Sequence, residues 1–271
     1  MSTDKLRSLI RLNWIAAGLH LVQGLAVIAL SRHFTLPISA SYLKFNQASQ
    51  HLEPASYQLF NISLPWLIAI FFFLSALAHF IIVTIYRKRY LANLNKGINK
   101  ARWIEYSLSA SIMIVAISLL VGIYDLGTLI ALFALTAIMN LCGLIMEVHN
   151  QTTANTNWLS YWVGALAGIV PWIVIALYFW AGAANDSKPP TFVYWIFVSI
   201  FLFFNCFALN MVLQYKKVGK WREYLYGERV LHNFEPSRKI LVSVAGLRWH
   251  SQAVVTAVLT SITVWSQRTY A

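Results

Sequence analysis

Six long apolar blocks constrain the fold of this chain more than any other sequence feature. They run about Leu9–Leu30, Ile62–Tyr86, Ala101–Ile123, Thr128–Met146, Trp158–Ala181 and Thr191–Tyr215. An α-helix needs about 20 apolar residues to cross the hydrocarbon core of a bilayer. A helix also satisfies every backbone hydrogen bond internally, which hydrocarbon requires. The blocks therefore predict an all-α, polytopic membrane protein.

Composition excludes an ordinary soluble domain. Apolar residues make up 59% of the chain and charged residues 11%, against roughly 25% charged in globular domains. The first block is too long for the apolar region of a signal peptide and lacks a clear cleavage site, so it is interpreted as a span. The net charge of +12 does not predict nucleic-acid binding, because the basic residues flank the apolar blocks. Cys142 and Cys206 lie inside blocks and predict neither a disulfide framework nor a metal motif.

The distribution of lysine and arginine predicts the orientation, since these residues accumulate in cytoplasmic segments. With the N-terminus inside, thirteen lie in inner segments and three, Arg32, Lys44 and Lys188, in outer ones. The N-terminus is therefore predicted to be cytoplasmic, and the long polar loop Ser31–Asn61 to lie outside. Alternation over Ala40–Phe45 weakly favours a short strand in that loop. The segment Tyr124–Gly127 is predicted to be a tight turn.

Ionisable residues inside spans are functional candidates, because burying them is costly. Glu105 lies one turn into the third span, and Ser109 shares its helix face and can hydrogen-bond toward the carboxylate. A solvated acid at a helix end is the alternative. Glu105 and His79 both belong to the inner half of the bundle and could share one polar cavity. His20 lies near the middle of the first span with Gln23 one turn away, and the alternative for each histidine is a packing or interfacial residue.

The other polar residues and most aromatic residues of the spans are interpreted as structural. Glu147 is interpreted as a helix-end acid, and Asn140 and Asn205 as hydrogen-bonding contacts between helices. The aromatic residues of the last two spans fit an interfacial belt or core packing. Trp172, near a span centre and beside the potential kink at Pro171, could instead form the wall of a flat apolar ligand's pocket.

The C-terminal tail does not fit a seventh span as it is written. Charged residues cost some 2.5–3.5 kcal/mol each at a helix centre, and the tail carries Glu235, Arg238, Lys239 and Arg248, with His250 following. The apolar run 253–265 is short for a span. We therefore expect six spans, an interfacial or disordered tail, and an open cleft where a seventh helix belongs.

Three motifs resemble the heliorhodopsin family of retinal proteins. They are Arg102-Trp-Ile-Glu-Tyr-Ser-Leu-Ser-Ala-Ser-Ile-Met113, Ile145-Met-Glu147 and Trp221-Arg-Glu-Tyr-Leu-Tyr-Gly-Glu-Arg229. The resemblance covers residues 5–229. It implies a seven-helix, rhodopsin-like bundle of inverted orientation in the cell membrane, which forms homodimers and signals to a cytoplasmic partner without pumping ions.

The same resemblance implies a cofactor and its site. All-trans retinal would be joined to a lysine as a protonated Schiff base, with Glu105 as its counterion. His20, Gln23 and His79 match the family's inner polar cluster, which would accept or share the proton. Ser109, Met139 and Trp172 are expected to belong to the cofactor site.

The tail departs from the family where the retinal-binding lysine is expected. That lysine lies in an apolar Val-Ala-Lys-Ser-like motif, whereas Lys239 stands in Pro236-Ser-Arg-Lys-Ile240. Codons permitted from Leu231 to Val254, read one base out of frame, can encode Tyr-Ile-Ile-Leu-Ser-Leu-Val-Ala-Lys-Ser and a further apolar stretch before a stop. We therefore divide the chain into a bundle, 1–229, and a frameshifted tail, 230–271. As written, it is expected to bind no retinal covalently, or only traces.

Two other non-enzymatic functions remain open. A light-gated channel or pump on the same fold would need a polar path through the bundle, and the outer halves of the spans carry few ionisable residues. A membrane scaffold without a chromophore is the other alternative if the tail is genuine.

Overall fold

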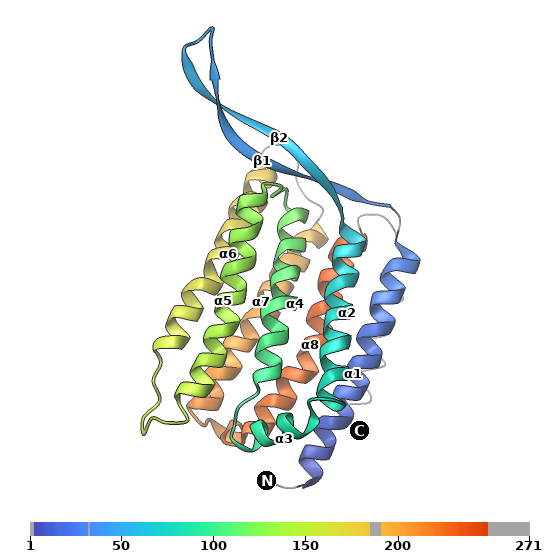
Figure 1. The fold of residues 1–271 in the computed structure, drawn as a ribbon, viewed down its shortest axis with the longest axis vertical. Coiled ribbons are helices and arrows are strands. Elements are labelled where there is room, and N and C mark those ends of the chain that lie inside the picture. Colours follow the sequence, from blue (N-terminus) through green and yellow to red (C-terminus); the bar gives the residue numbers. More distant parts are fainter. Residues whose placement is uncertain (1–2, 32, 185–190, 249–271) are drawn as a thin grey trace.

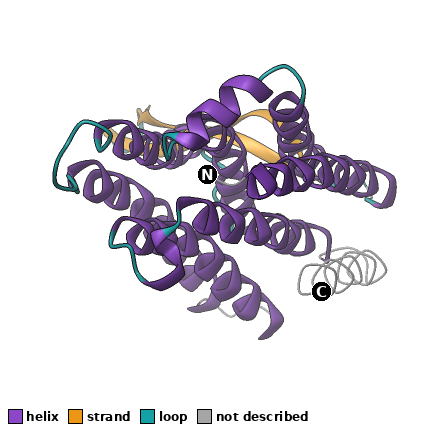
Figure 2. Ribbon diagram, turned by 90° about the horizontal axis from the view of Figure 1, so that it is seen from below, coloured by secondary structure: helices purple, strands orange, loops and turns teal. Residues whose placement is uncertain are grey.

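Seven long helices lie side by side in a computed structural model, which describes residues 3–31, 33–184 and 191–248 (Figures 1 and 2). The all-α prediction is confirmed for the bundle. The long helices are α1 (Thr3–Leu30), α2 (Leu64–Val83), α4 (Lys100–Leu120), α5 (Leu126–His149), α6 (Leu159–Ala184), α7 (Thr191–Tyr215) and α8 (Tyr224–Arg248). All except α8 are long and apolar enough to cross a membrane, which confirms the six predicted spans.

Local signals in the sequence set several helix ends. Pro65 stands in the first turn of α2, where its missing N–H removes no intrahelical hydrogen bond. The side chain of Asn99 accepts from the Arg102 amide and caps α4, and Asp125 caps α5 through the Thr128 amide. The largest apolar core lies between α2, α4, α6 and α7, around Phe71 and Met113.

The predicted long first loop is a β-hairpin that projects beyond the bundle (Figure 1). Strands β1 (Thr35–Asn46) and β2 (His51–Ser63) pair antiparallel, with an irregularity between Ile38 and Ser39. The short predicted strand, 40–45, is therefore only the middle of a longer one, because cross-strand pairing extends it in both directions.

The hairpin is anchored at the turn between α4 and α5. The Ser39 amide donates to the Tyr124 carbonyl at 2.9 Å, and the Ser41 amide donates to Asp125 Oδ1 at 3.2 Å. Hydrogen bonds, chiefly from the Thr128 amide, lower the pKa of Asp125. One carboxylate thus caps α5 and holds the hairpin at this end of the bundle.

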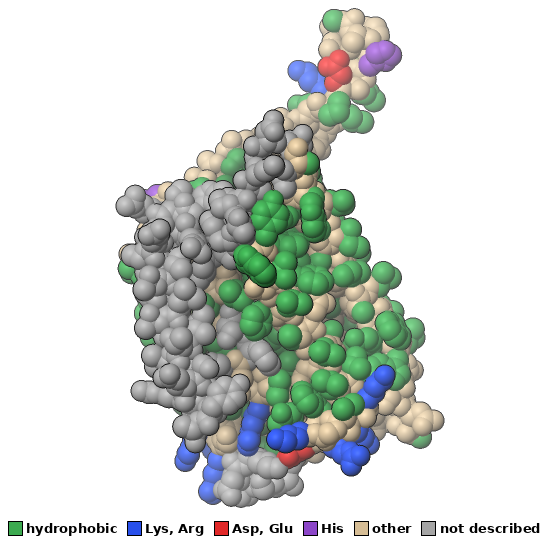
Figure 3. All heavy atoms as spheres, turned by 180° about the vertical axis from the view of Figure 1, so that it is seen from behind, with side chains coloured by type: hydrophobic (Ala, Val, Ile, Leu, Met, Phe, Trp, Pro, Cys, Tyr) green, Lys and Arg blue, Asp and Glu red, His purple; other side chains and the backbone are tan. Residues whose placement is uncertain are grey.

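Lysine and arginine side chains gather at the opposite end, below an apolar band (Figure 3). That end carries the short helix α3 (Arg87–Asn95) and the single-turn helix η1 (Gly219–Arg222), which join α2 to α4 and α7 to α8. The two ends of the bundle therefore differ in charge as the sequence pattern predicted.

The expectation of an open cleft in place of a seventh helix is wrong. Helix α8 packs against α7, α1, α4 and α2 and completes the bundle. Its polar residues Glu228, Glu235 and Lys239 are at most 4% exposed. They can be buried because each has a charged partner on α4 or on α8 itself. The free-energy cost of inserting each charged residue, which led to the expected cleft, takes no account of such partners. The predicted apolar run 253–265 and His250 lie outside the described residues.

Candidate functional site

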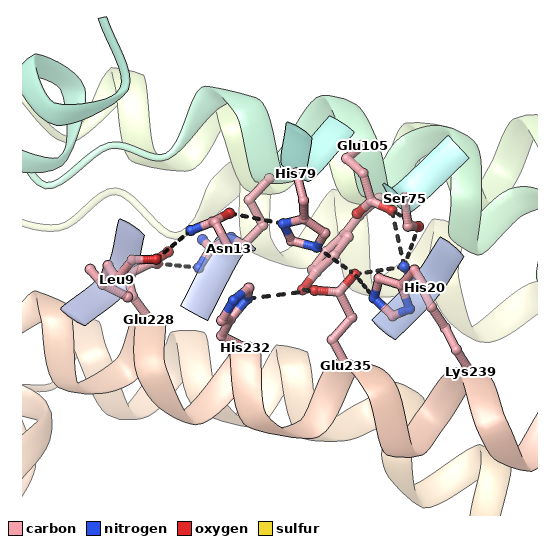
Figure 4. Close-up of polar contacts among 12 residues, drawn as sticks. Leu9, Asn13, His20, Ser75, His79, Glu105, Glu228, His232, Glu235 and Lys239 are labelled. Atoms are coloured by element: carbon pink, nitrogen blue, oxygen red, sulfur yellow. Dashed lines mark hydrogen bonds and ion pairs between the residues drawn. The ribbon is translucent and has the colours of Figure 1, made fainter. Parts of the chain in front are cut away.

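A buried lysine and two carboxylates form the centre of the bundle (Figure 4). Lys239, on α8, is fully buried, and its Nζ lies 3.1 Å from Oε1 of Glu105, on α4. Nζ also lies 2.6 Å from Oε1 of Glu235, one turn earlier on α8. The i, i+4 spacing places the latter pair on one helix face. With the lysine protonated and both carboxylates ionised, these three side chains carry a net charge of −1.

Neutral side chains complete the coordination of these charges. The Ser75 hydroxyl, on α2, contacts both Glu105 and Lys239. The Tyr106 hydroxyl, on α4, donates to Glu235 Oε2 at 3.2 Å. The predicted Ser109–Glu105 hydrogen bond is absent: Ser109 Oγ is buried and has no hydrogen-bond partner among the described residues. Ser75 takes that place because α2 packs directly against α4.

The predicted inner polar cluster is assembled around Glu235. His20 and His79 stack with ring centroids 5.6 Å apart. Their Nε2 atoms lie 3.6 and 3.5 Å from Glu235 Oε1. His20 Nδ1 is 2.9 Å from Gln23 Oε1, so the cluster includes Gln23. The structure thus brings the three predicted residues together beside the lysine.

Two further residues extend this cluster toward the charged end of the bundle. His79 Nδ1 lies 2.8 Å from Asn13 Oδ1. His232, on α8, has its ring 5.1 Å from that of His79 and its Nδ1 3.8 Å from Glu235 Oε2. Histidines grouped around a carboxylate can share a proton with it.

The His20, His79 and Glu235 ligand atoms also lie close enough together to hold a metal ion. The Lys239 ammonium lies 2.6 Å from the same Glu235 oxygen that both histidines approach. A metal cation would have to share that oxygen with a second positive charge, so the geometry favours proton sharing over metal binding.

A second buried charge network lies closer to the lysine- and arginine-rich end. Arg102 Nη2 lies 2.7 Å from Glu147 Oε1, and Nη1 contacts Glu228. Asn99 donates to both carboxylates, through its backbone to Glu147 and its side chain to Glu228. Glu147 lies near the end of α5, as interpreted, but it is 1% exposed and is paired with Arg102 inside the bundle.

A cavity of about 30 Å³ connects the two charge networks. Arg102 and Glu228 line it at one end and Glu105 and Glu235 at the other. This is enough volume for one or two water molecules. Tyr90, on α3, also lines it, and burial raises the pKa of Tyr90 well above its ordinary value. A polar path therefore exists from Lys239 toward the charged end of the bundle.

The remaining candidates lie on the α5–α6–α7 side of the bundle. Met139 packs against Gly168, where a Cβ would meet its sulfur at 2.3 Å. Trp172, one turn from Gly168, is 6% exposed and meets the rings of Phe197, Phe201 and Phe204 edge-on. No described contact joins Met139 or Trp172 to Lys239; they form an apolar aromatic wall.

Among the described residues, neither Asn140 nor Asn205 forms a hydrogen bond to another helix. Asn140 Nδ2 donates to the Thr136 carbonyl, and Asn205 Nδ2 to the Phe201 carbonyl, each one turn earlier in its own helix. The interhelical interpretation is wrong because a side-chain amide can satisfy itself on its own helix backbone.

Several site residues were missed at the sequence level. Ser75, Tyr106 and His232 carry no motif that distinguishes them from packing residues. Glu235 was counted only as a burial cost, although its spacing from Lys239 signalled a pair on one helix face.

The comparisons with known proteins agree with this architecture. Residues 9–232 match the family model described as Heliorhodopsin. The match includes Glu105 and ends before Glu235 and Lys239. A search of curated proteins found no match.

Proposed function

This chain belongs to the heliorhodopsin family, and from that premise we propose that its bundle is that of a retinal-binding membrane photoreceptor that signals rather than pumps, with covalent loading of the chain as written limited to traces. One observation carries the proposal. Lys239 presents a buried primary amine 3.1 Å from the Glu105 carboxylate, inside a bundle of seven helices. A lysine beside a carboxylate is the arrangement in which a cationic linkage to an aldehyde can be held and tuned.

Ser109 on α4 and the apolar α5–α6–α7 side of the bundle supply the kinds of group that suit all-trans retinal. Retinal, when bound through a lysine, supplies light absorption and isomerisation. The unpartnered, buried Ser109 hydroxyl lies one turn from Glu105 on the same face of α4, and it would supply a hydrogen-bonding group on the side of the linkage, the one polar part of bound retinal. The apolar wall of Met139 and Trp172 offers the surface that a polyene requires.

The polar cluster has a separate role in this proposal. Glu105 holds a proton at the lysine nitrogen through its negative charge. His20 and His79, with Gln23 orienting His20, would accept or share a proton through Glu235, which contacts both rings. The cavity toward Arg102 would let that charge change reach the cytoplasmic end.

A sensor fits the bundle better than a channel or pump. Among the described residues, every buried ionisable side chain lies at the level of Lys239 or nearer the charged end. The outer half of the core is apolar. Photocurrent across a planar bilayer tests this alternative: a sustained light-driven current would replace the sensor with a transporter. Homodimerisation and a cytoplasmic signalling partner are proposals that rest on the family resemblance.

A membrane scaffold without chromophore is the second candidate, favoured by the polar tail sequence. Absorbance after addition of all-trans retinal separates the two. A visible band that disappears when Lys239 is replaced by arginine supports a photoreceptor. Absence of a band in both this chain and its frame-restored version would leave the scaffold.

We also propose that the N-terminus is cytoplasmic and the hairpin outside, in the plasma membrane. Charge asymmetry supports this orientation. In a background lacking Cys142 and Cys206, a cysteine at position 46, at the end of β1, should react with an impermeant maleimide in intact cells. A cysteine at position 96, after α3, should react only after permeabilisation. The reverse pattern would refute the inverted orientation.

Removing the Glu105 charge should change colour and proton affinity together. In the frame-restored protein loaded with retinal, Glu105→Gln should red-shift the absorption band. The Schiff base should also lose its proton at a lower pH than in the parent protein, because the carboxylate that stabilises its cation is gone. A tenfold loss of proton affinity corresponds to about 1.4 kcal/mol. An unchanged spectrum and titration, with Glu53→Gln on the hairpin as control, would assign the counterion role to another group.

A further inference from the structure

A pocket of about 300 Å³ opens at the lysine- and arginine-rich end of the bundle, away from Lys239. It is formed where three connections meet: the loop after α3, the loop between α5 and α6, and the segment from the end of α7 to the start of α8. Its volume is at the lower end of the range for small-molecule sites. Nothing in the proposed photoreceptor function uses this pocket.

The lining of the pocket suits an anion. Lys217 and Arg222 supply two positive charges, and none of the described lining residues is acidic. Asn150, Gln151 and Thr153 also line it, and their side-chain hydrogen bonds to the end of α5 and to one another hold that wall in place; Tyr215 adds an aromatic wall. Arg222 Nε donates to the Lys217 carbonyl at 3.3 Å, which ties the arginine side chain to the backbone at the pocket's other cationic residue. A planar guanidinium and an ammonium that line one pocket are well matched to phosphate oxygens.

The backbone at Lys217 provides an independent observation. Lys217 has a φ of 53°. The amides of Lys217 and Val218 donate to the Gln214 and Leu213 carbonyls, so α7 ends in a Schellman motif with Lys217 in the left-handed position.

Glycine is the usual residue at that position, because a side chain strains the left-handed backbone. The chain itself uses glycine there in two equivalent motifs, Gly97 after α3 and Gly122 after α4. At α7 it instead carries a lysine on the rim of a cationic pocket. A strained side chain at a concave site is a signature of function.

We propose that this pocket binds a phosphate group, held by Lys217 and Arg222. The phosphate belongs to an anionic lipid headgroup at the inner membrane surface or to a small soluble phosphate compound. Tyr224 lines the pocket, and its hydroxyl donates to Glu147 Oε1 at 3.2 Å. An occupant would therefore contact a residue of the Arg102 charge network.

The test uses the full chain in nanodiscs without retinal, so its outcome is independent of the photoreceptor proposal. In phosphatidylcholine nanodiscs, inorganic phosphate is titrated at constant ionic strength and binding is followed by calorimetry. In nanodiscs that contain phosphatidylglycerol, the lipid retained by the protein is counted by native mass spectrometry. Saturable binding of inorganic phosphate shows that the pocket can take its phosphate group from a small soluble compound. Selective retention of phosphatidylglycerol, with weak phosphate binding, identifies a lipid headgroup.

Three variants test whether binding depends on the two cationic residues of the pocket or only on the positive charge of this end of the bundle. Lys217→Gly removes one cation and relieves the backbone strain, so the melting temperature should be unchanged or higher while binding weakens about tenfold, as expected for loss of a charged hydrogen bond. Arg222→Gln should weaken binding at least as much. Lys220→Ala removes an exposed lysine that does not line the pocket and should have little effect. Equal losses in all three variants, or no binding of either probe, would overturn the proposal.

Discussion

Glu235→Ser should raise the yield of retinal joined to Lys239 at least about tenfold over the chain as written, from traces to a readily measured fraction. Lys239 is held by Glu105 and Glu235 at 3.1 and 2.6 Å. An amine attacks an aldehyde only when it is free of its proton, and charged hydrogen bonds contribute about 1.5–3 kcal/mol each. Removing one carboxylate also restores a one-to-one pair with Glu105. Serine is a residue that the displaced reading frame can encode at this position.

The experiment adds all-trans retinal to membranes, reduces with borohydride and quantifies the modified Lys239 peptide. Glu53→Ser, at the exposed end of β2, is the matched control for loss of a carboxylate. The frame-restored protein sets the upper limit of yield, and Lys239→Arg sets the background. Equal yields from the chain as written and from the Glu235 variant would show that Glu235 does not hinder attachment. A high yield from the chain as written would also disprove the expected trace loading.

Arg102→Met should destabilise the folded protein by about 3–5 kcal/mol, because it leaves buried carboxylates without their cation. Glu147 and Glu228 are 1% and 4% exposed and both depend on Arg102 for compensation. Unfolding in detergent by a denaturant series, followed by circular dichroism, measures the effect.

Lys100→Met provides the control for Arg102→Met. Lys100 is exposed, two residues earlier on α4, and its loss removes the same charge from the surface, where single pairs contribute little. Adding Glu147→Gln and Glu228→Gln to Arg102→Met should recover part of the loss, since no unpaired charge then remains. If Arg102→Met unfolds within about 1 kcal/mol of Lys100→Met, the network does not stabilise the bundle as described.

The spans and the charge asymmetry could be predicted because each depends on a local property of the chain. Blocks of about 20 apolar residues leave helices as the stable form in hydrocarbon, and all six were found. Glu105, His20 and His79 were recognisable as candidates because ionisable residues are rare in spans. Gln23 followed from its spacing with His20, and the structure confirms their contact.

The partners of those residues could not be predicted, because they come from other helices. Ser75 and Tyr106 reach the centre only through the packing of α2, α4 and α8. Glu147 could be recognised as an acid at a helix end, but not its buried pairing with Arg102, which lies 45 positions away in the sequence.

The tail shows the same division most clearly. By itself the sequence determined six apolar helices, the difference in charge between the two ends of the bundle, and a C-terminal segment too polar to be counted as a span. Only the tertiary structure decided where that segment lies, because Glu228, Glu235 and Lys239 are acceptable inside the bundle only when Arg102, Glu105 and the histidines face them. Hydropathy adds residue costs along one helix, whereas the free energy of a buried charge depends on which opposite charge the fold brings within about 3 Å of it.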